Sequence, residues 1–273
     1  MKKLKYLTKE QELLVFNQRK LGYKRKDIVS RWGISERYYK DIILSNGGEL
    51  NPKIRKYKFN EDYFENIDTE DKAYFLGFIV ADGSIHCGNN SIKLIQSEKN
   101  ILEKFKKYIE FEGPIYESKT RNINVLTISS FKTKSDLDNL GIYANKTNVV
   151  MYPNIPEHLE RHFMRGVFDG DGCISLRTDK RDNSNRGQVN ICSGSKDFIY
   201  EYYNKIVDYA CLSGRNKVRC PKSTYYVIDW GGLSDVEKIY DFFYKDATVF
   251  LERKKETFDR VVSITRKKKK YRK

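Results

Sequence analysis

Two aspartates stand where the sequence predicts the ends of two short apolar helices. Residues 74–83 and residues 163–172 align at an offset of 89 positions, and both segments end in an Asp-Gly pair. The aspartates are Asp82 and Asp171. Because the C-terminal end of a helix carries partial negative charge, a carboxylate there is unfavourable unless a cation is near. The repeated pattern therefore indicates a cation site.

Chemistry follows if the two helices pack in parallel and bring these carboxylates together. Their mutual repulsion would raise their pKa values, and a divalent cation such as Mg²⁺, which prefers hard oxygen ligands, relieves that repulsion. Two carboxylates with metal at a two-fold axis suit phosphodiester hydrolysis, in which the metal activates water and stabilises the leaving oxygen. The alternative is that each Asp-Gly pair only ends a helix and begins a turn, but the matched repetition favours the metal site.

The helices that carry the aspartates have glycine in their interiors. Glycine inside a helix costs about 1 kcal/mol relative to alanine, yet Gly77 recurs as Gly166, and the small residues Ala81 and Gly170 follow four positions later. Residues four apart share a helix face, and a face of small residues lets two backbones approach closely. We therefore predict that the two helices pack on each other about a pseudo-two-fold axis.

The segments that follow the two helices are also alike, since each predicts a hairpin, a helix, two strands and another helix. In the first copy these are strands 84–87 and 91–96, helix 98–109, strands 114–118 and 124–129, and helix 134–140. In the second copy they are strands 173–178 and 188–192, helix 196–210, strands 217–220 and 224–230, and helix 234–244. The pattern predicts an α+β fold of two tandem αββαββα units, each with a four-stranded antiparallel sheet that has helices on one face and is open on the other.

The two helical segments resemble the LAGLIDADG motif of homing endonucleases. Met164–Gly172 matches the Gly-x-x-Asp-Gly-Asp-Gly ending of that motif. Phe75–Gly83 departs from it, because Val80 stands where the motif has its earlier acid. That acid, Asp169 in the second copy, is usually not the catalytic one in the family.

The resemblance covers about residues 71–262. It implies a monomer with pseudo-two-fold symmetry, whose two saddle-shaped sheets lie over double-stranded DNA. It also implies that Asp82 and Asp171 are catalytic and bind divalent metal, Mg²⁺, with Gly83 and Gly172 beside it, and that each side cuts one strand across the minor groove. No small-molecule cofactor is implied.

Supporting catalytic residues follow from local matching to the same family. The polar position after the second strand of each unit is matched by Glu98, and more weakly by Ser195. The basic position near the end of each copy is matched by Lys146 and by Lys254, with Arg253 as a substitute for the latter. Such a lysine could stabilise charge on the phosphate or polarise an attacking water, although a lysine in so basic a chain is equally often a surface residue.

Exposed strand positions would contact the grooves and phosphates of the DNA. The expected contacts are Lys93, Lys119 and Arg121 in the first copy and Arg177, Lys180, Arg181 and Arg186 in the second. A register slip of one residue would turn these side chains to the other face.

The first fifty residues predict a small all-α domain. A capping box at residues 8–11 begins one helix, a second helix fits residues 24–32, and Ser35 caps a third. Two short helices joined by a glycine turn in a basic segment resemble a helix-turn-helix, which would place Arg37 and Lys40 of the third helix on DNA. A helical domain that binds protein is the alternative.

Charge and composition exclude several classes. Lys and Arg number 52 against 37 Asp and Glu, for a net charge of +15, of which +6 lies in residues 1–50 and +7 in residues 266–273. Such a balance favours a polyanionic partner, either nucleic acid or an anionic membrane surface. The longest apolar run, nine residues at 73–81, is too short to span a membrane. Five cysteines without a CxxC pair and the lack of a secretory signal predict a cytoplasmic protein, with an organelle or a phage-infected cell as the alternatives.

The predicted organisation is a helix-turn-helix domain at 1–50, a linker at 51–70, LAGLIDADG units at 71–150 and 151–265, and a basic tail at 266–273. The ends of the chain lack the Cys or Ser start and His-Asn finish of a self-splicing intein, so we expect a free-standing or intron-encoded protein. The predicted function is site-specific cleavage of double-stranded DNA. The alternatives are an RNA maturase and a non-cutting DNA-binding regulator. Retention of both motif aspartates argues against the regulator, and a helix-turn-helix suits duplex DNA better than RNA.

Overall fold

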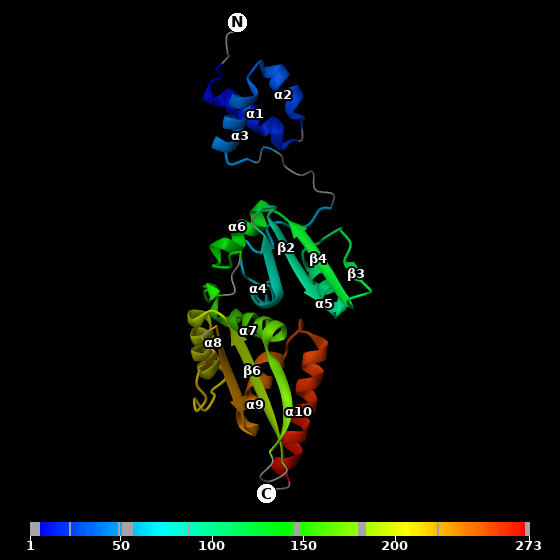
Figure 1. Cartoon of the computed structure of the whole chain (residues 1–273), viewed down its shortest axis with the longest axis vertical. Coiled ribbons are helices and arrows are strands. Elements are labelled where there is room, and N and C mark those ends of the chain that lie inside the picture. The colour runs from blue at the N-terminus through cyan, green and yellow to red at the C-terminus, as the bar shows by residue number, and fades with distance from the viewer. Residues whose placement is uncertain are drawn as a thin grey trace. The chain divides into compact units, whose positions relative to one another are not determined.

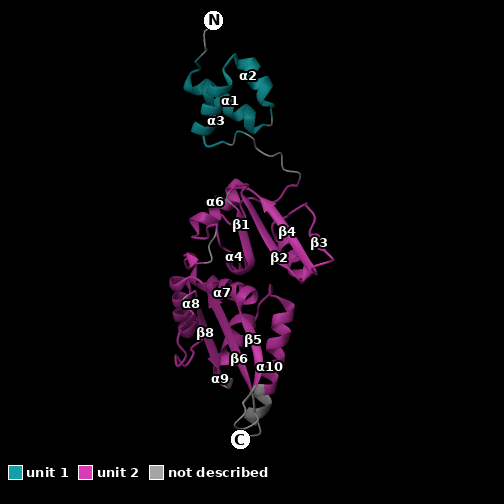
Figure 2. Ribbon diagram, viewed as in Figure 1, with its two compact units in different colours: residues 1–56 teal, residues 57–273 magenta. Residues whose placement is uncertain are grey.

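The computed structural model describes residues 6–21, 23–48, 50, 57–86, 88–144, 148–179, 184–222 and 224–270. The chain divides into two compact units, residues 1–56 and residues 57–273 (Figure 2). Three residues predicted as site residues, Lys146, Lys180 and Arg181, lie outside the described ranges.

Unit 1 contains the three predicted helices, α1 (Lys9–Lys20), α2 (Arg25–Trp32) and α3 (Glu36–Ser45). The capping box is present, because the Thr8 hydroxyl accepts a hydrogen bond from the Gln11 amide while the Gln11 side chain accepts one from the Thr8 amide. Gly33 ends α2 with a φ of 62°, a left-handed conformation that glycine adopts readily. Ser35 then caps α3 by accepting from the Tyr38 amide. The helices enclose a separate core that includes Val15, Ile28 and Tyr39.

Unit 2 contains both predicted copies of the αββαββα unit (Figure 1). The first copy comprises α4 (Glu70–Asp82), β1 (Gly83–His86), β2 (Ser91–Gln96), α5 (Lys99–Tyr108), β3 (Tyr116–Ser118), β4 (Ile123–Ser129) and α6 (Phe131–Asn139). The second comprises α7 (Glu157–Asp171), β5 (Cys173–Asp179), β6 (Ser184–Ser193), α8 (Lys196–Tyr209), β7 (Arg219–Lys222), β8 (Tyr225–Gly231) and α9 (Leu233–Tyr244). The sheets are antiparallel, with strand orders β1-β2-β4-β3 and β5-β6-β8-β7. The predicted α+β architecture is confirmed.

Each sheet has one covered face and one open face. In β2, Ile92 and Leu94 are buried, whereas Lys93 between them is partly exposed. Residues directly opposite on neighbouring strands share a face, and Leu94 is paired with the buried Leu126 of β4. The same alternation holds in the second sheet, so we can assign each strand residue to the covered or the open face.

The two copies meet where α4 and α7 cross at their glycines. A Cβ added to Gly77 would lie 2.0 Å from the Phe163 carbonyl oxygen, and a Cβ added to Gly166 would lie 2.0 Å from the Tyr74 carbonyl oxygen. This reciprocity is the expected pseudo-two-fold relation. One turn further on, a Cβ on Gly170 would lie 2.3 Å from that of Ala81, so the helices run in parallel.

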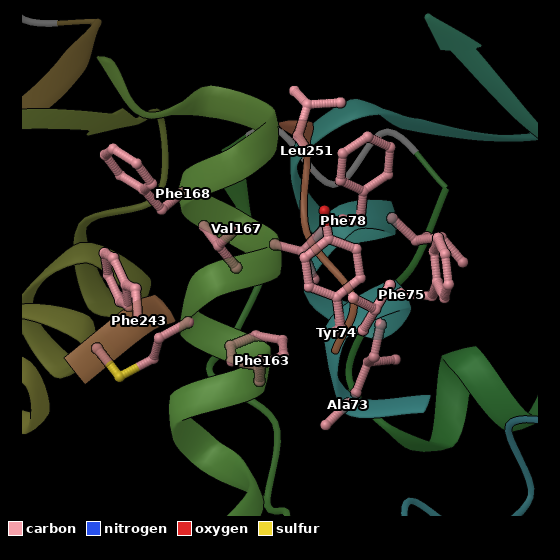
Figure 3. Close-up of a cluster of buried hydrophobic side chains, with 14 of the residues drawn as sticks. Ala73, Tyr74, Phe75, Phe78, Phe163, Val167, Phe168, Phe243 and Leu251 are labelled. Atoms are coloured by element: carbon pink, nitrogen blue, oxygen red, sulfur yellow. The ribbon is translucent and has the colours of Figure 1, made fainter. Parts of the chain in front are cut away.

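Large side chains pack around this glycine crossing. Figure 3 shows Tyr74 and Phe78 of α4 facing Phe163 and Val167 of α7. These side chains are buried. Side chains too large for the crossing therefore flank it, while the glycines leave the backbones free to touch.

Two segments differ from the sequence-based prediction. Residues 57–70 were expected to be part of a linker, but Tyr63 and Phe64 are buried in the core of unit 2. Aromatic side chains of this size bury enough apolar surface to hold the segment against the fold.

A helix that was not predicted, α10 (Glu252–Lys270), completes the second copy. It buries Phe258, Val261 and Val262 at helical spacing and includes the start of the predicted basic tail. Although α10 is the longest helix, neither it nor any other helix of the described residues is long and apolar enough to cross a membrane.

We expect that Gly166→Ala destabilises unit 2, because the added methyl group would collide with backbone rather than with a movable side chain. Overpacking costs about 1–3 kcal/mol and occasionally more, which corresponds to roughly 2–12 °C in melting temperature. Thermal unfolding followed by circular dichroism measures the shift. Gly88→Ala is the matched control, since a Cβ there would have no neighbour within 4 Å. Equal melting temperatures for the two variants would contradict the assigned crossing.

Candidate active site at the ends of helices α4 and α7

Asp82 and Asp171 are the last residues of α4 and α7. The glycine after each aspartate closes its helix, since the Gly83 amide donates to the Ile79 carbonyl and the Gly172 amide to the Phe168 carbonyl. The chain then passes directly into β1 or β5. Each aspartate therefore stands at a junction between a helix and a strand that leaves little room for movement.

The two helix ends converge, as their parallel packing requires. The site at which Gly170 would carry a Cβ is 3.2 Å from Oδ2 of Asp82, so the Asp82 carboxylate lies against the last turn of α7. A single buried ammonium, that of Lys254, is influenced by both motif aspartates. Burial lowers the pKa of Lys254, while Asp169, Asp82 and Asp171 act to raise it.

Gln96 is a site residue that the sequence analysis did not identify. Its Nε2 donates a hydrogen bond to Oδ2 of Asp82. The strand register explains the contact, because Gly83 pairs with Leu94 and places the end of β2 beside Asp82. The sequence signal for Gln96 was therefore its place as a polar residue at the end of β2, since β2 pairs with the strand that follows the motif.

The matching position in the second copy has different chemistry. Cys173 pairs with Asn190, so Ser193 occupies the position that Gln96 has in the first sheet. The Ser193 hydroxyl accepts from the Ser195 amide at 3.1 Å. Beside it, partial desolvation and the nearby Asp171 charge raise the pKa of the Cys192 thiol. The two aspartates therefore have unlike neighbours.

Lys254 does not have the free ammonium expected of a residue that contacts the phosphate. Its Nζ donates to the carbonyl oxygens of Phe168, at 2.7 Å, Gly170, at 3.2 Å, and Gly172. The carbonyls of Gly170 and Gly172 lie at and just beyond the C-terminal end of α7, where carbonyls lack partners within the helix. The Phe168 carbonyl accepts from Lys254 in addition to the Gly172 amide. Lys254 thus holds the end of α7, and its predicted role in catalysis stays a prediction. The Gly172 carbonyl accepts one of these hydrogen bonds, and its predicted place beside the metal stays a prediction.

Glu98, whose catalytic role stays a prediction, bridges the two copies. Its carboxylate accepts from Nε of Arg253 at 2.9 Å and from the Arg253 amide at 3.4 Å. Arg253, the expected substitute for Lys254, is thereby engaged in an ion pair. Ser195, the weaker match to Glu98, caps α8 by accepting from the Phe198 amide, and its hydroxyl donates to the Val150 carbonyl.

Asp169, the earlier acid of the second motif, is buried and belongs to the packing of the helices. It accepts hydrogen bonds from the Tyr74 hydroxyl at 2.8 Å, the Tyr244 hydroxyl at 2.7 Å and the Leu251 amide at 2.7 Å. Burial raises the pKa of the Asp169 carboxyl, although these hydrogen bonds act in the opposite direction.

A second buried charge cluster holds the segment that leads to Lys254. The fully buried Arg165 donates to the Val249 carbonyl at 3.0 Å and to Oε1 of Glu70 at 2.7 Å. Glu70 belongs to the first copy, and it also accepts from the Thr248 amide at 2.8 Å. Burial and the adjacent Arg165 charge lower the pKa of His162 to about 4, so this histidine is neutral at pH 7.

The predicted DNA contacts that are described lie on accessible surfaces. Arg177 and Arg186 are exposed cross-strand partners on the open face of the second sheet. Lys93 lies on the open face of the first sheet, opposite Ser84 and Thr127.

The remaining predicted DNA contacts lie in unit 1 and in the turn between β3 and β4. In α3, Arg37 and Lys40 are exposed, while Tyr39, Ile42 and Ile43 are buried. The other two candidates, Lys119 and Arg121, are exposed in the turn between β3 and β4.

The donor set at the helix ends is small. Among the described residues no three His, Cys, Asp or Glu side chains gather as a metal-binding group. Asp82 and Asp171 together fit a hard cation, since both present carboxylate oxygens at helix ends of the same partial charge. Gly83 lies at the start of β1, next to Asp82.

Structural comparison identifies the fold. The chain resembles the LAGLIDADG homing endonuclease I-LtrWI bound to target DNA with a TM-score of 0.50 and 14% identity, over 77% of this chain and 92% of that one. It resembles the LAGLIDADG meganuclease I-AabMI bound to uncleaved DNA with a TM-score of 0.52 and 17% identity, over 71% and 91% of the two chains. This chain has the LAGLIDADG homing endonuclease fold. A further LAGLIDADG-fold neighbour is I-SmaMI with uncleaved DNA and calcium ions, at a TM-score of 0.52 and 12% identity, over 74% of this chain and 93% of that one.

Sequence comparison gives weaker relations. No family model matches the chain. It is 25% identical to the glutamine–fructose-6-phosphate aminotransferase of Methanocaldococcus jannaschii over an alignment of 231 residues, which covers 73% of this chain and 20% of that protein. It is 26% identical over 157 residues to the reverse gyrase of the same organism, which is 56% of this chain and 9% of that protein. The chain thus spans a fifth or less of these relatives, whose named activities are unrelated to each other.

Replacing Lys254 separates its holding role from direct catalysis. We expect Lys254→Met to lower the stability of unit 2 by about 2 kcal/mol or more, because three carbonyls lose a charged donor. The corresponding loss in melting temperature is roughly 4–8 °C. Lys255→Met is the matched control, since the Lys255 ammonium pairs with Asp259 near the surface. An unchanged melting temperature together with lost DNA cleavage would favour the catalytic role.

Proposed function

We propose that the chain is a site-specific endonuclease of double-stranded DNA, with a divalent metal held by Asp82 and Asp171. The observation that supports this function best is that the helix ends that carry Asp82 and Asp171 lie side by side beyond the close crossing of α4 and α7. A pair of like charges at helix ends of the same sign is costly unless a cation joins them.

Mg²⁺ is the cation that we propose, since it favours carboxylate oxygens and keeps several waters. When bound, it supplies Lewis-acid activation of water and stabilisation of the leaving oxygen. The chain's own residues orient the carboxylates. Gln96 fixes one oxygen of Asp82 by a hydrogen bond, and Lys254 holds the end of α7 on which Asp171 stands.

The open sheet faces are the proposed DNA-binding surface. Polar and basic side chains alternate there with the buried residues of the covered face, and they include Lys93, Arg177 and Arg186. A β-sheet ribbon fits the major groove of B-DNA, where each base pair presents a distinct set of donors and acceptors. Basic residues beside the side chains that contact bases add sequence-independent affinity for phosphates.

Unit 1 is proposed as a further DNA-binding module of helix-turn-helix type. Its third helix exposes Arg37 and Lys40, and the tight turn at Gly33 joins it to α2. Exposed basic side chains on the last helix of such a module are positioned for DNA contact.

Asp82→Asn and Asp171→Asn should each abolish double-strand cleavage while leaving DNA binding nearly intact, because each change removes one carboxylate charge without altering shape. The assay uses genomic DNA that flanks the coding element, with and without the element, in the presence of Mg²⁺. Binding is measured separately in Ca²⁺. Asp208→Asn, an exposed change on α8, is the control. Undiminished cutting by either motif variant would refute the metal assignment.

Loss of the unit 1 contacts should appear in the salt dependence of binding. Each phosphate contact contributes about 0.9 to the slope of log affinity against log salt. A double Arg37→Gln and Lys40→Gln variant should therefore lose roughly 2 from that slope. A double Lys107→Gln and Lys196→Gln variant removes the same charge from exposed positions on α5 and α8 and controls for net charge. Equal slopes for the two variants would exclude α3 from the interface.

A further inference from the structure

Asp229 places a carboxylate on the open face of the second sheet. Asp229 lies between Ile228 and Trp230 of β8, which are both buried on the covered face. Its Oδ1 accepts a hydrogen bond from Nε2 of Gln188 at 2.9 Å, and its Oδ2 accepts from the guanidinium of Arg219. The three side chains come from β6, β7 and β8 and form a network on one surface.

A carboxylate in this place needs a physical reason. It faces outward from a chain of net charge +15, on the surface proposed to meet the phosphates of DNA. An uncompensated negative charge there would weaken binding to a polyanion. Arg219, whose side chain is 61% exposed, compensates that charge, and the Asp229 side chain is only 20% exposed. The carboxylate therefore acts on its two neighbours rather than on solvent.

Asp229 fixes which hydrogen-bonding groups of Gln188 and Arg219 remain available to a ligand. An ionised carboxylate only accepts hydrogen bonds, so the amide of Gln188 must turn its Nε2 toward Asp229. The amide oxygen and the second N–H of Gln188 then remain for a ligand. The guanidinium of Arg219 has five N–H groups in a fixed fork, and its contact with Asp229 leaves others directed elsewhere. Glutamine pairs with adenine N6 and N7, and arginine with guanine O6 and N7.

The first sheet offers an internal comparison at the same register positions. Arg219 pairs with Val227, as Tyr116 pairs with Val125, and Gln188 pairs with Gly231, as Ser91 pairs with Ser129. By the same alignment Thr127 corresponds to Asp229. The network of arginine, aspartate and glutamine in the second sheet is thus replaced in the first by tyrosine, threonine and serine, and the Ser91 hydroxyl is engaged with Asn89.

We propose that Arg219, Asp229 and Gln188 form a base-reading unit that recognises a guanine and an adjacent adenine in the major groove of one half of the DNA target. Arg219 and Gln188 contact the bases, and Asp229 is the positioning residue that orients both. The half of the target beneath the first sheet is read by different chemistry at the equivalent position. This inference rests on the proposed function.

The test is a binding experiment with the full chain in Ca²⁺, on a library in which each base pair of the selected target is varied in turn. Asp229→Asn should flatten the preference at one or two adjacent positions of one half-site by roughly 5-fold to 100-fold. Its affinity for unrelated duplex DNA should stay equal or rise, because a negative charge has left the surface. Arg219→Gln should lose the guanine preference at one of the same positions. Thr127→Val is the matched change in the first sheet. It should leave the base preference in the half-site read by the second sheet unaltered.

Two results would overturn the inference. One is an Asp229→Asn variant with the wild-type preference at every position. The other is a uniform loss of affinity for all sequences by both Asp229→Asn and Arg219→Gln, which would assign the network to support of the sheet alone. A wild-type chain that binds duplex DNA without any sequence preference would instead overturn the proposed function, so the two failures are distinguishable.

Discussion

The structure of unit 2 depends on one contact between backbones. Where α4 and α7 cross, Gly77 and Gly166 leave so little space that even a methyl group would overlap a carbonyl oxygen. Every other feature of the site follows from this distance. It sets the two helix ends side by side, and because each end continues directly into a strand, it also sets the orientation of both sheets. A wider crossing would separate Asp82 from the last turn of α7 and leave two unrelated acidic residues.

Buried charge reinforces the crossing and differs between the two copies. The second copy has Asp169, Arg165 and Lys254 around α7, all buried and all hydrogen-bonded to backbone or hydroxyl groups. The matching position to Asp169 in the first copy is Val80, which packs as an apolar side chain. Buried charged groups of this kind are strongly destabilising when one partner is removed. The pseudo-symmetry of the backbone therefore conceals an asymmetric set of polar interactions.

Much of this arrangement was predictable because its signals are local or repeated. The glycine spacing of the motif helices, the Asp-Gly pairs and the alternation within the strands each reflect short-range geometry, and the alignment of two copies reinforced every assignment. The roles of Glu98 and Lys254 were not predictable in the same way, because their partners, Arg253 and the carbonyls of α7, lie more than eighty residues away in sequence. Gln96 required the strand register. Helix α10 was not predicted, because its apolar positions lie among many lysines and arginines. Phe258, Val261 and Val262 nevertheless keep helical spacing.

The segment between α9 and α10 and the first turn of α10 belong to the second copy by sequence but are held in part by the first. The carboxylate of Glu70 accepts from the amides of Thr248 and Val249, and that of Glu98 accepts from the amide of Arg253. The second copy consequently depends on hydrogen bonds to the first, so the two halves cannot be exchanged freely between proteins. A chimaera that joins this C-terminal half to a foreign N-terminal half could keep the glycine crossing. It would lack the carboxylates of Glu70 and Glu98, unless the donor half supplied carboxylates at the two corresponding positions.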